Sequence, residues 1–296
     1  MFLGIEIGGT KLQLGVGRGD GSPFVALERR PIEIACGAAG ILAQIAEAAP
    51  TLIQTHGVKR VGFGFGGPVR AHLGRVTTSH QVGGWDDFPL VEWCEKTLRL
   101  PAALGNDCDV AALAEARFGA GRGEEIVFYV TVGTGVGGGL VIGGRNHGAS
   151  RPAVAEIGHL RPGLEATDSH TTVESLAAGP GIAVAMRREL RDPAREITGR
   201  QVADLAAAGD EVAIRVLRGA TQALGWAIAQ VITLVAPSVV VVGGGVSLSG
   251  EKLFFQPLRE QVAKYVFPPL GGTYRVVPAA LGEDVVVLGA LALAAS

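Results

Sequence analysis

Turns rich in glycine and threonine occur twice in the chain, each between two apolar stretches. The first turn is Gly8-Gly9-Thr10, and the second holds Gly133, Thr134, Gly135 and Gly137. Glycines in a turn leave backbone N–H groups uncovered by side chains, so an oxyanion can approach them closely. We therefore expect both turns to hold phosphate groups, although two ordinary hairpins would show the same pattern.

The second turn also satisfies the G-x-G-x-x-G spacing of dinucleotide sites, from Gly133 through Gly135 to Gly138. That fingerprint requires a helix directly after the glycines, because the N-terminus of the helix binds the pyrophosphate. Here the apolar stretch Leu140–Ile142 follows, which is typical of a strand. The sequence therefore favours a phosphate-binding hairpin over a dinucleotide site.

Polar side chains stand at two other places where a reaction or a ligand could use them. Asn106 and Asp107 lie between a short strand and a helix, where a carboxylate suits a general base and where either residue equally suits an N-cap. Glu156 and His159 are three positions apart and would share a face of a helix. They could bind a ligand there, or form a salt-bridged turn on the surface.

Two further glycine corners complete the candidates. Gly66-Gly67-Pro68 allows close approach of the backbone to a ligand, and a plain turn explains the same residues. Gly243, Gly244 and Gly245 stand between a strand and a helix, an arrangement that fits a nucleotide-binding corner.

Hydrophobic patterning predicts the elements that position these residues. Strands are expected on both sides of each glycine turn, and the two similar hairpins suggest a duplicated architecture. A helix from Ala38 is expected to end before Pro50. The other expected elements are strands at Val25–Ile34, Val61–Phe65, Ala102–Leu104, Val239–Val242 and Arg275–Pro278, and helices at Pro89–Arg99, Cys108–Phe118, Glu251–Val266 and Asp284–Ala295, with helical patterns in Glu211–Val235.

The composition indicates a globular chain with a large core. Of the 296 residues, 48% are hydrophobic and 18% are charged, as in folded rather than disordered proteins. This length fits one large or two medium domains. The net charge is −2 and basic residues form no long run, so we expect no nucleic-acid partner and no membrane surface as partner. Cys36, Cys94 and Cys108 share no spacing typical of a metal or redox site.

One apolar stretch, Ala223–Val242, has the length of a membrane span. It contains Gln230 and Thr233, and Pro237 divides it, so a buried helix followed by a buried strand is the better interpretation. No basic segment typical of a secretory signal precedes the first strand. We therefore expect a cytoplasmic protein.

Taken together, these motifs resemble the ROK family of sugar kinases, within the actin-like ATPase superfamily. The resemblance runs over nearly the whole chain, and the motifs stand in family order. The matching segments are the first phosphate motif Gly4–Lys11, the catalytic segment Gly105–Asp107, the second phosphate motif Thr131–Gly139, the sugar-binding elements Glu156–His159 and Glu174, and the adenosine-side corner Val242–Ser247.

The resemblance implies an α/β protein with two lobes around a central cleft. Each lobe would contain a ribonuclease-H-like sheet flanked by helices. The N-terminal lobe would comprise residues 1–118, with helix 284–296 packed back on it, and the C-terminal lobe residues 119–283. The segment Gly119–Gly123 is the candidate linker. A homodimer is also implied.

The resemblance further implies an ATP-dependent hexose kinase of carbohydrate metabolism that uses Mg²⁺. Asp107 would accept the proton of a sugar hydroxyl as that oxygen attacks the γ-phosphorus of Mg-ATP. The sugar would be bound by Gly67, Asn106, Asp107, Glu156, His159 and Glu174. The nucleotide would be bound by Gly8, Gly9, Thr10, Lys11, Gly133, Thr134, Gly135, Gly137, Gly243, Gly244 and Gly245.

The chain departs from the family pattern at two places. Glu6 stands where the commoner form has Asp, and its longer side chain could reach a Mg²⁺-bound water. The family's zinc loop of three cysteines is absent, since residues 160–173 contain no cysteine. His159 with Asp168 and His170 would supply three ligands, whereas a structural zinc site normally has four. We therefore expect no structural zinc.

Glucose, phosphorylated at its 6-hydroxyl, is the expected substrate. Fructose, an N-acetylhexosamine, or glucose with polyphosphate as donor are the enzymatic alternatives. A sugar-binding regulator without catalysis is the alternative from another class. Regulators of this family carry an N-terminal helix-turn-helix, for which no room precedes the first phosphate motif, and Asp107 is retained. Both features favour an enzyme.

Overall fold

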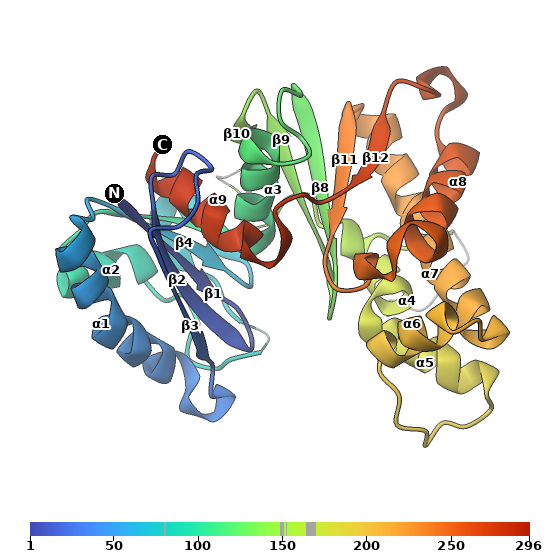
Figure 1. Cartoon of the computed structure of the whole chain (residues 1–296), viewed down its shortest axis with the longest axis horizontal. Helices are drawn as coiled ribbons and strands as arrows, with labels where there is room; N and C mark the ends of the chain where they lie inside the picture. The colour runs from blue at the N-terminus through green and yellow to red at the C-terminus, as the bar shows by residue number, and fades with distance from the viewer. Residues whose placement is uncertain (80, 149–150, 152, 164–169) are drawn as a thin grey trace. The chain divides into compact units, whose positions relative to one another are not determined.

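The computed structural model describes residues 1–79, 81–148, 151, 153–163 and 170–296, which form two compact units (Figure 1). Unit 1 comprises Met1–Gly123, Gly139–Val154 and Leu281–Ser296, and unit 2 comprises Glu124–Gly138 and Ala155–Ala280. These units differ from the two lobes expected from the sequence at residues 119–123, 139–154 and 281–283. The lobe boundaries remain a prediction.

The structure contains two five-stranded sheets whose strands follow the same order. In each sheet the first three strands in sequence are neighbours, and two later strands extend the sheet beyond the first one. Strand β1 is antiparallel to β2 and parallel to β4, and β8 is parallel to β11. This repetition confirms the duplicated architecture. The first sheet is β3 (Ala26–Pro31), β2 (Lys11–Gly17), β1 (Phe2–Ile7), β4 (Val61–Phe65) and β7 (Ala102–Asn106); the second is β10 (Arg145–Asn146), β9 (Val136–Ile142), β8 (Ile126–Val132), β11 (Val239–Gly243) and β12 (Arg275–Pro278).

Helices belong to both units. A short two-stranded sheet, β5 (Val69–Arg70) with β6 (Arg75–Val76), also lies in unit 1. The helices of unit 1 are α1 (Gly37–His56), α2 (Leu90–Leu98), α3 (Asp107–Phe118) and α9 (Val285–Ala294). Those of unit 2 are α4 (Val173–Ala177), α5 (Gly179–Glu189), α6 (Gly199–Ala207), α7 (Glu211–Val235) and α8 (Gln256–Tyr265), the last preceded by a π-helical turn at Glu251–Phe255.

The two faces of the first sheet carry different residues. On β1, Leu3, Ile5 and Ile7 point to one face and belong to the same buried cluster as Ile41 and Ile45 of α1. Successive strand residues alternate between the faces, so the residues between these three point the other way. The opposite face carries Gly4 and Glu6 of β1, and it is the face that α9 covers.

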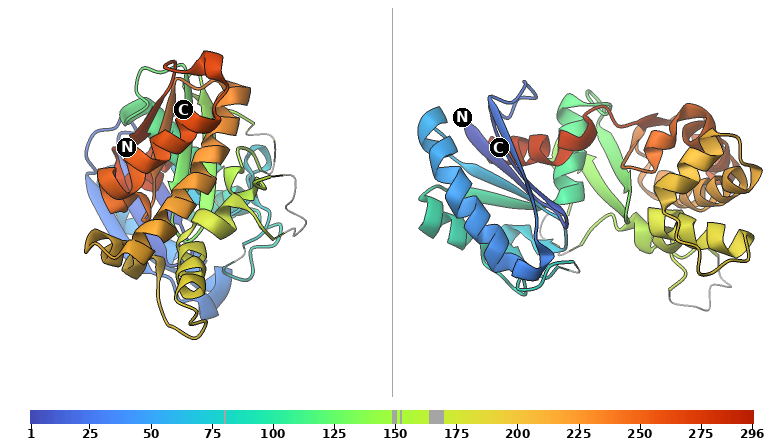
Figure 2. Two further views of the ribbon diagram at one scale, coloured as in Figure 1. Left: turned by 90° about the vertical axis from the view of Figure 1, so that its right-hand side faces the viewer. Right: turned by 60° about the horizontal axis from the view of Figure 1, so that its bottom comes forward.

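Glycines on that opposite face let α9 lie directly against the strands (Figures 1 and 2). A Cβ atom added to Gly4 would lie 2.6 Å from the carbonyl oxygen of Val287, and one added to Gly62 would lie 1.9 Å from that of Ala290. Both distances are shorter than van der Waals contact. Helix α9, near the end of the sequence, therefore packs directly on glycines of β1 and β4, which come early in the sequence.

Helix α1 does not end at Pro50, so that expectation is wrong. The helix continues to His56. Proline removes one backbone N–H donor from a helix, but Pro50 is exposed, which places the interruption on the solvent side. Ala48 and Ala49 are buried on the other side and hold the helix against the core.

The segment Ile34–His56, which includes α1, is the one helix among the described residues that is long and apolar enough to cross a membrane. A core helix of a folded protein meets the same criterion. Ile41 and Ile45 of α1 are buried in the core of unit 1.

The apolar stretch Ala223–Val242 divides as expected. Helix α7 ends at Val235, Ala236 adopts a left-handed conformation with φ of 51°, and β11 begins at Val239. The strand β12 also has the expected bounds, Arg275–Pro278.

Candidate active site

The first glycine turn joins β1 to β2 in unit 1. The N–H of Gly8 donates to the carbonyl of Lys11 at 3.1 Å and closes the turn. Gly8 and Gly9 are half-buried and Thr10 is exposed, so solvent reaches this backbone. The predicted binding of phosphate by Gly8, Gly9 and Thr10 fits this exposure.

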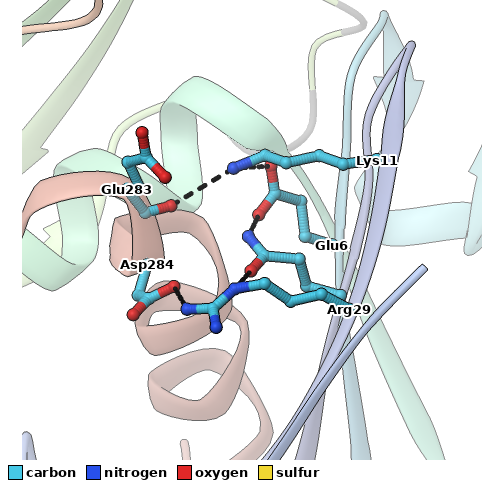
Figure 3. Close-up of polar contacts among 6 residues, drawn as sticks. Glu6, Lys11, Arg29, Glu283 and Asp284 are labelled. Carbon is cyan, nitrogen blue, oxygen red and sulfur yellow. Dashed lines mark hydrogen bonds and ion pairs between the residues drawn. The ribbon is translucent and has the colours of Figure 1, made fainter. Parts of the chain in front are cut away.

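Glu6 precedes the first turn and is only 6% exposed. Its Oε1 lies 3.4 Å from Nζ of Lys11, and its Oε2 accepts a hydrogen bond of 2.6 Å from Nε2 of Gln13 (Figure 3). Burial raises the pKa of Glu6 above its usual value, Lys11 and Gln13 oppose this shift, and the charge of Asp107 adds to it. A Cβ atom built on Gly66 would lie 3.5 Å from both Oδ2 of Asp107 and the Cα of Gly8, and one built on Gly8 would lie 3.9 Å from Oε1 of Glu6. The two carboxylates therefore flank the contact between Gly8 and Gly66 and form an oxygen-rich corner.

Asn106 is the N-cap of α3. Its Oδ1 accepts from the N–H groups of Cys108 (2.8 Å) and Asp109 (3.4 Å), and its Nδ2 donates to the carbonyl of Gly67 at 2.9 Å. The capping interpretation is therefore confirmed. The side chain also ties the Gly-Gly-Pro corner to the start of α3. Both ends of the amide bind protein groups, and the binding of a sugar by Asn106 stays a prediction.

Asp107 is the first residue of α3 and is half-buried. Its Oδ1 accepts from the N–H of Cys108 at 2.8 Å. Its Oδ2 lies 3.5 Å from the position of a Cβ atom built on Gly66, so the glycine corner runs directly beside this carboxylate. The corner around Gly66 and Gly67 and the candidate base are thus assembled in one place.

The second glycine turn lies between β8 and β9 in unit 2, and the strand that follows it confirms the hairpin rather than the dinucleotide motif. The N–H of Gly133 donates to the carbonyl of Gly135 at 2.8 Å. The side chain of Glu174 accepts from the N–H of Val136 at 2.9 Å. A Cβ atom on Gly135 would lie 2.6 Å from Glu174 Oε2, whereas one on Gly133 would meet nothing within 4 Å. Glu174 therefore supports the turn from one side, and the space beside Gly133 is open.

Glu156 and His159 are both exposed, on a 3₁₀ turn whose buried residues are Ile157 and Gly158. Both polar residues therefore lie on a short turn at the surface, and a common role in binding a ligand stays a prediction. Partial desolvation raises the pKa of Glu156, and the neighbouring carboxylate of Glu174 raises it further, while His159 lowers it. The N–H of Val173 donates to the carbonyl of Leu160 at 2.9 Å, so the turn that carries Glu156 and His159 is bonded to the start of α4, which carries Glu174.

The third glycine corner follows β11. Gly244 has a φ of +89°, and a Cβ atom there would lie 2.5 Å from the carbonyl of Val132, which ends β8. Gly245 has open space beside it. A 3₁₀ turn at Ser247–Ser249 follows the glycines. The helix expected at Glu251–Val266 is present as the π-helical turn Glu251–Phe255 followed by α8.

No group of three His, Cys, Asp or Glu side chains in the described part of the chain is arranged to hold a metal ion. Asp168 falls outside the described residues, as do the neighbouring positions 164–167 and 169. The absence of structural zinc therefore stays a prediction.

The sequence did not predict two residues of unit 1 that form hydrogen bonds around Glu6. Gln13, on β2, is 1% exposed and bonds Glu6, and Arg29, on β3, bonds Gln13. The available signal was a glutamine inside the apolar strand Leu12–Val16. A polar group buried in a strand is generally hydrogen-bonded, so a buried glutamine at this position implies a partner close by.

Comparisons with known proteins agree over the full chain length. The ROK family model matches residues 2–296. The glucokinase of Halalkalibacterium halodurans is 32% identical over 311 residues, covering 97% of this chain and 93% of that protein. The crystal structure of ROK hexokinase from Thermus thermophilus has a TM-score of 0.85 at 31% identity and covers 99% of this chain and 97% of its own. The ROK family glucokinase from Streptomyces griseus, solved with glucose and AMPPNP, has a TM-score of 0.81 at 29% identity and covers 99% and 98%.

Proposed function

We propose that this chain, which belongs to the ROK family and is a sugar kinase, transfers the γ-phosphate of ATP to the 6-hydroxyl of glucose. Its fold is the two-lobed actin-like ATPase fold, with sheets of the ribonuclease-H-like type, as the family resemblance implied. The observation that carries the proposal is the position of Asp107, at the start of α3 and beside the Gly66–Gly67 corner.

The proposed reaction depends mainly on positioning and on charge stabilisation, as phosphoryl transfer does in general. Asp107 accepts the proton of the attacking hydroxyl. The hydrogen bond from the N–H of Cys108 fixes one carboxylate oxygen, so the other oxygen is held in a defined direction. The first and second glycine turns supply N–H groups for the phosphates, and Lys11 adds a positive charge at the first turn.

Mg²⁺ would arrive with ATP as part of the substrate, where it neutralises phosphate charge. The two carboxylates that flank Gly8 and Gly66, those of Glu6 and Asp107, fit this ion, since Mg²⁺ prefers oxygen ligands and binds with one or two carboxylates plus phosphates. Glu6 would contact it through water.

Glucose and ATP are the substrates that the relatives support. The Halalkalibacterium relative is named a glucokinase, and the Streptomyces griseus structure contains glucose and AMPPNP. Homodimer formation remains a prediction from the family resemblance, and a cytoplasmic location remains a prediction from the sequence.

The test of specificity is a coupled assay of the purified chain with glucose, fructose, mannose and N-acetylglucosamine, first with Mg-ATP and then with polyphosphate. We expect the highest kcat/KM for glucose with ATP. A higher value for another sugar, or turnover with polyphosphate alone, would overturn the assigned substrate or donor. Absence of turnover with every pair would overturn the proposal.

A further inference from the structure

We propose that Gln13 and Arg29 are positioning residues for Glu6, and that the segment leading into α9 anchors them. The proposal rests on the proposed function, in which Glu6 contacts Mg-ATP. A continuous line of hydrogen bonds runs from Glu6 through Gln13 and Arg29 to Asp284 (Figure 3). Lys11 donates a further hydrogen bond to the carbonyl of Glu283.

Strand register places the three side chains in one row. Glu6 of β1 is paired with Gln13 of β2, and Gln13 is paired with Arg29 of β3. Residues directly opposite each other in antiparallel strands point to the same face and contact one another. The row therefore lies on the face of the sheet that α9 covers.

Arg29 anchors the Gln13 amide in the orientation that Glu6 requires. A guanidinium group only donates hydrogen bonds, so the oxygen of the amide must face it. Nε of Arg29 donates to Oε1 of Gln13 at 2.7 Å, and this leaves Nε2 of Gln13 to donate to Glu6 at 2.6 Å. Without Arg29, Oε1 of Gln13 loses this donor, and the Gln13 side chain is no longer anchored on the side away from Glu6.

The ends of the row are fixed by residues just before α9. Nη2 of Arg29 bonds Oδ1 of Asp284 at 2.8 Å, and Nζ of Lys11 donates to the carbonyl of Glu283 at 3.4 Å. Glutamate has one more rotatable bond than aspartate, so a glutamate at position 6 has more freedom to lose. The row removes that freedom by holding Oε2, which leaves Oε1 directed toward Lys11.

Residues that orient a metal-contacting group typically alter metal affinity or activity about 10- to 100-fold when they are removed. The experiment measures binding of AMPPNP to the full chain by calorimetry, with and without Mg²⁺, for wild type, Gln13→Leu and Arg29→Met. We expect Mg-dependent affinity to fall about 10- to 100-fold for Gln13→Leu and about tenfold for Arg29→Met. Affinity without Mg²⁺ and affinity for glucose should stay within about twofold, because the row acts only through Glu6.

Arg30→Met is the matched control. Arg30 is the next residue on β3, so its side chain points to the other face of the sheet, where it pairs with Glu28 and Glu47 at 2.6 and 2.8 Å. We expect it to bind Mg-AMPPNP like wild type. Arg29→Lys keeps a donor toward Gln13 and should restore most of the affinity lost in Arg29→Met.

Three outcomes would overturn the inference. The first is unchanged Mg-dependent affinity for AMPPNP in Gln13→Leu, and the second is an equal loss of that affinity in Arg29→Met and Arg30→Met. The third is a loss of AMPPNP affinity that is equal with and without Mg²⁺. If Gln13→Leu does not fold, Arg29→Met decides, because the side chain of Arg29 is 57% exposed and tolerates replacement. Glu6→Gln separates the two levels of the proposal. Wild-type binding by Glu6→Gln would contradict the role of Glu6 itself, whereas loss there without loss in the row variants would contradict only the row.

Discussion

Asn106 shows how one side chain can connect a helix to a loop. Its oxygen caps α3 and its nitrogen binds the carbonyl of Gly67. Removing an N-cap typically costs about 1 kcal/mol. The second bond has a different consequence, because it holds the glycine corner beside Asp107.

We expect Asn106→Ala to lower the free energy of unfolding by about 1 to 2 kcal/mol and to raise the KM for the sugar severalfold. Asp210→Ala is the control, since Asp210 caps α7 through the N–H of Ala213 at 2.8 Å. Urea unfolding and sugar kinetics measure both effects. A control with a similar loss of stability and a similar rise in KM would mean that the Gly67 contact has no specific role.

Gly133 offers a direct test of the second turn. The space beside it is open, so the protein without ligand accepts a methyl group there. If phosphates occupy this space, Gly133→Ala should weaken AMPPNP binding at least about tenfold while sugar affinity and melting temperature stay unchanged. Gly219→Ala on α7, also beside open space, should change neither affinity. Unchanged nucleotide affinity in Gly133→Ala would place the phosphates elsewhere.

The raised pKa of Glu156 leads to a prediction about the pH dependence of sugar binding. Desolvation and the charge of Glu174 raise its pKa above the usual 4.5, so protonation occurs at a higher pH than for an ordinary glutamate. Sugar binding that uses the ionised carboxylate is therefore complete above the raised pKa and lost as the pH falls through it. We expect kcat/KM for the sugar to fall at acid pH. In Glu156→Gln, kcat/KM should be low at every pH and should show no such fall. If the variant shows the same fall at acid pH, another group causes it.

At the scale of elements, local patterns predicted strands and helices well wherever one periodicity dominated. The boundary between α7 and β11 and the start of α3 are examples. The failure at Pro50 has a physical cause: burial of Ala48 and Ala49 outweighs one lost hydrogen bond on an exposed side. The contact of Glu174 with Val136 spans 38 positions and links two elements, so no local pattern contains it.

The glycine face of the first sheet leads to a stability prediction. Gly62→Ala would place a methyl group 1.9 Å from the carbonyl of Ala290 and force α9 away from β4. We expect the free energy of unfolding to fall by about 1 to 3 kcal/mol, the usual cost of overpacking. Gly83→Ala, which has open space beside it, should cost little. Equal unfolding midpoints in urea for the two variants would show that α9 is not held this closely.

At the scale of the molecule, duplication explains why two glycine turns exist. Each turn joins the first and second strands of a sheet with the same strand order, β1 to β2 and β8 to β9. The sequence could predict the family and this repeat because the motifs are local and stand in order. It could not predict the row from Glu6 to Asp284, because this row depends on the register of three strands and on a helix from the other end of the chain.

The central claim is that this sugar kinase uses Asp107 as its general base, and turnover of Asp107→Asn tests it most directly. Asparagine keeps an oxygen for the N–H of Cys108, so the fold and glucose affinity should be retained. General-base assistance is worth about 10² to 10⁴ in rate, so kcat with glucose and Mg-ATP should fall at least about a hundredfold. Turnover within a few-fold of wild type, in a variant with normal glucose affinity, would contradict the account.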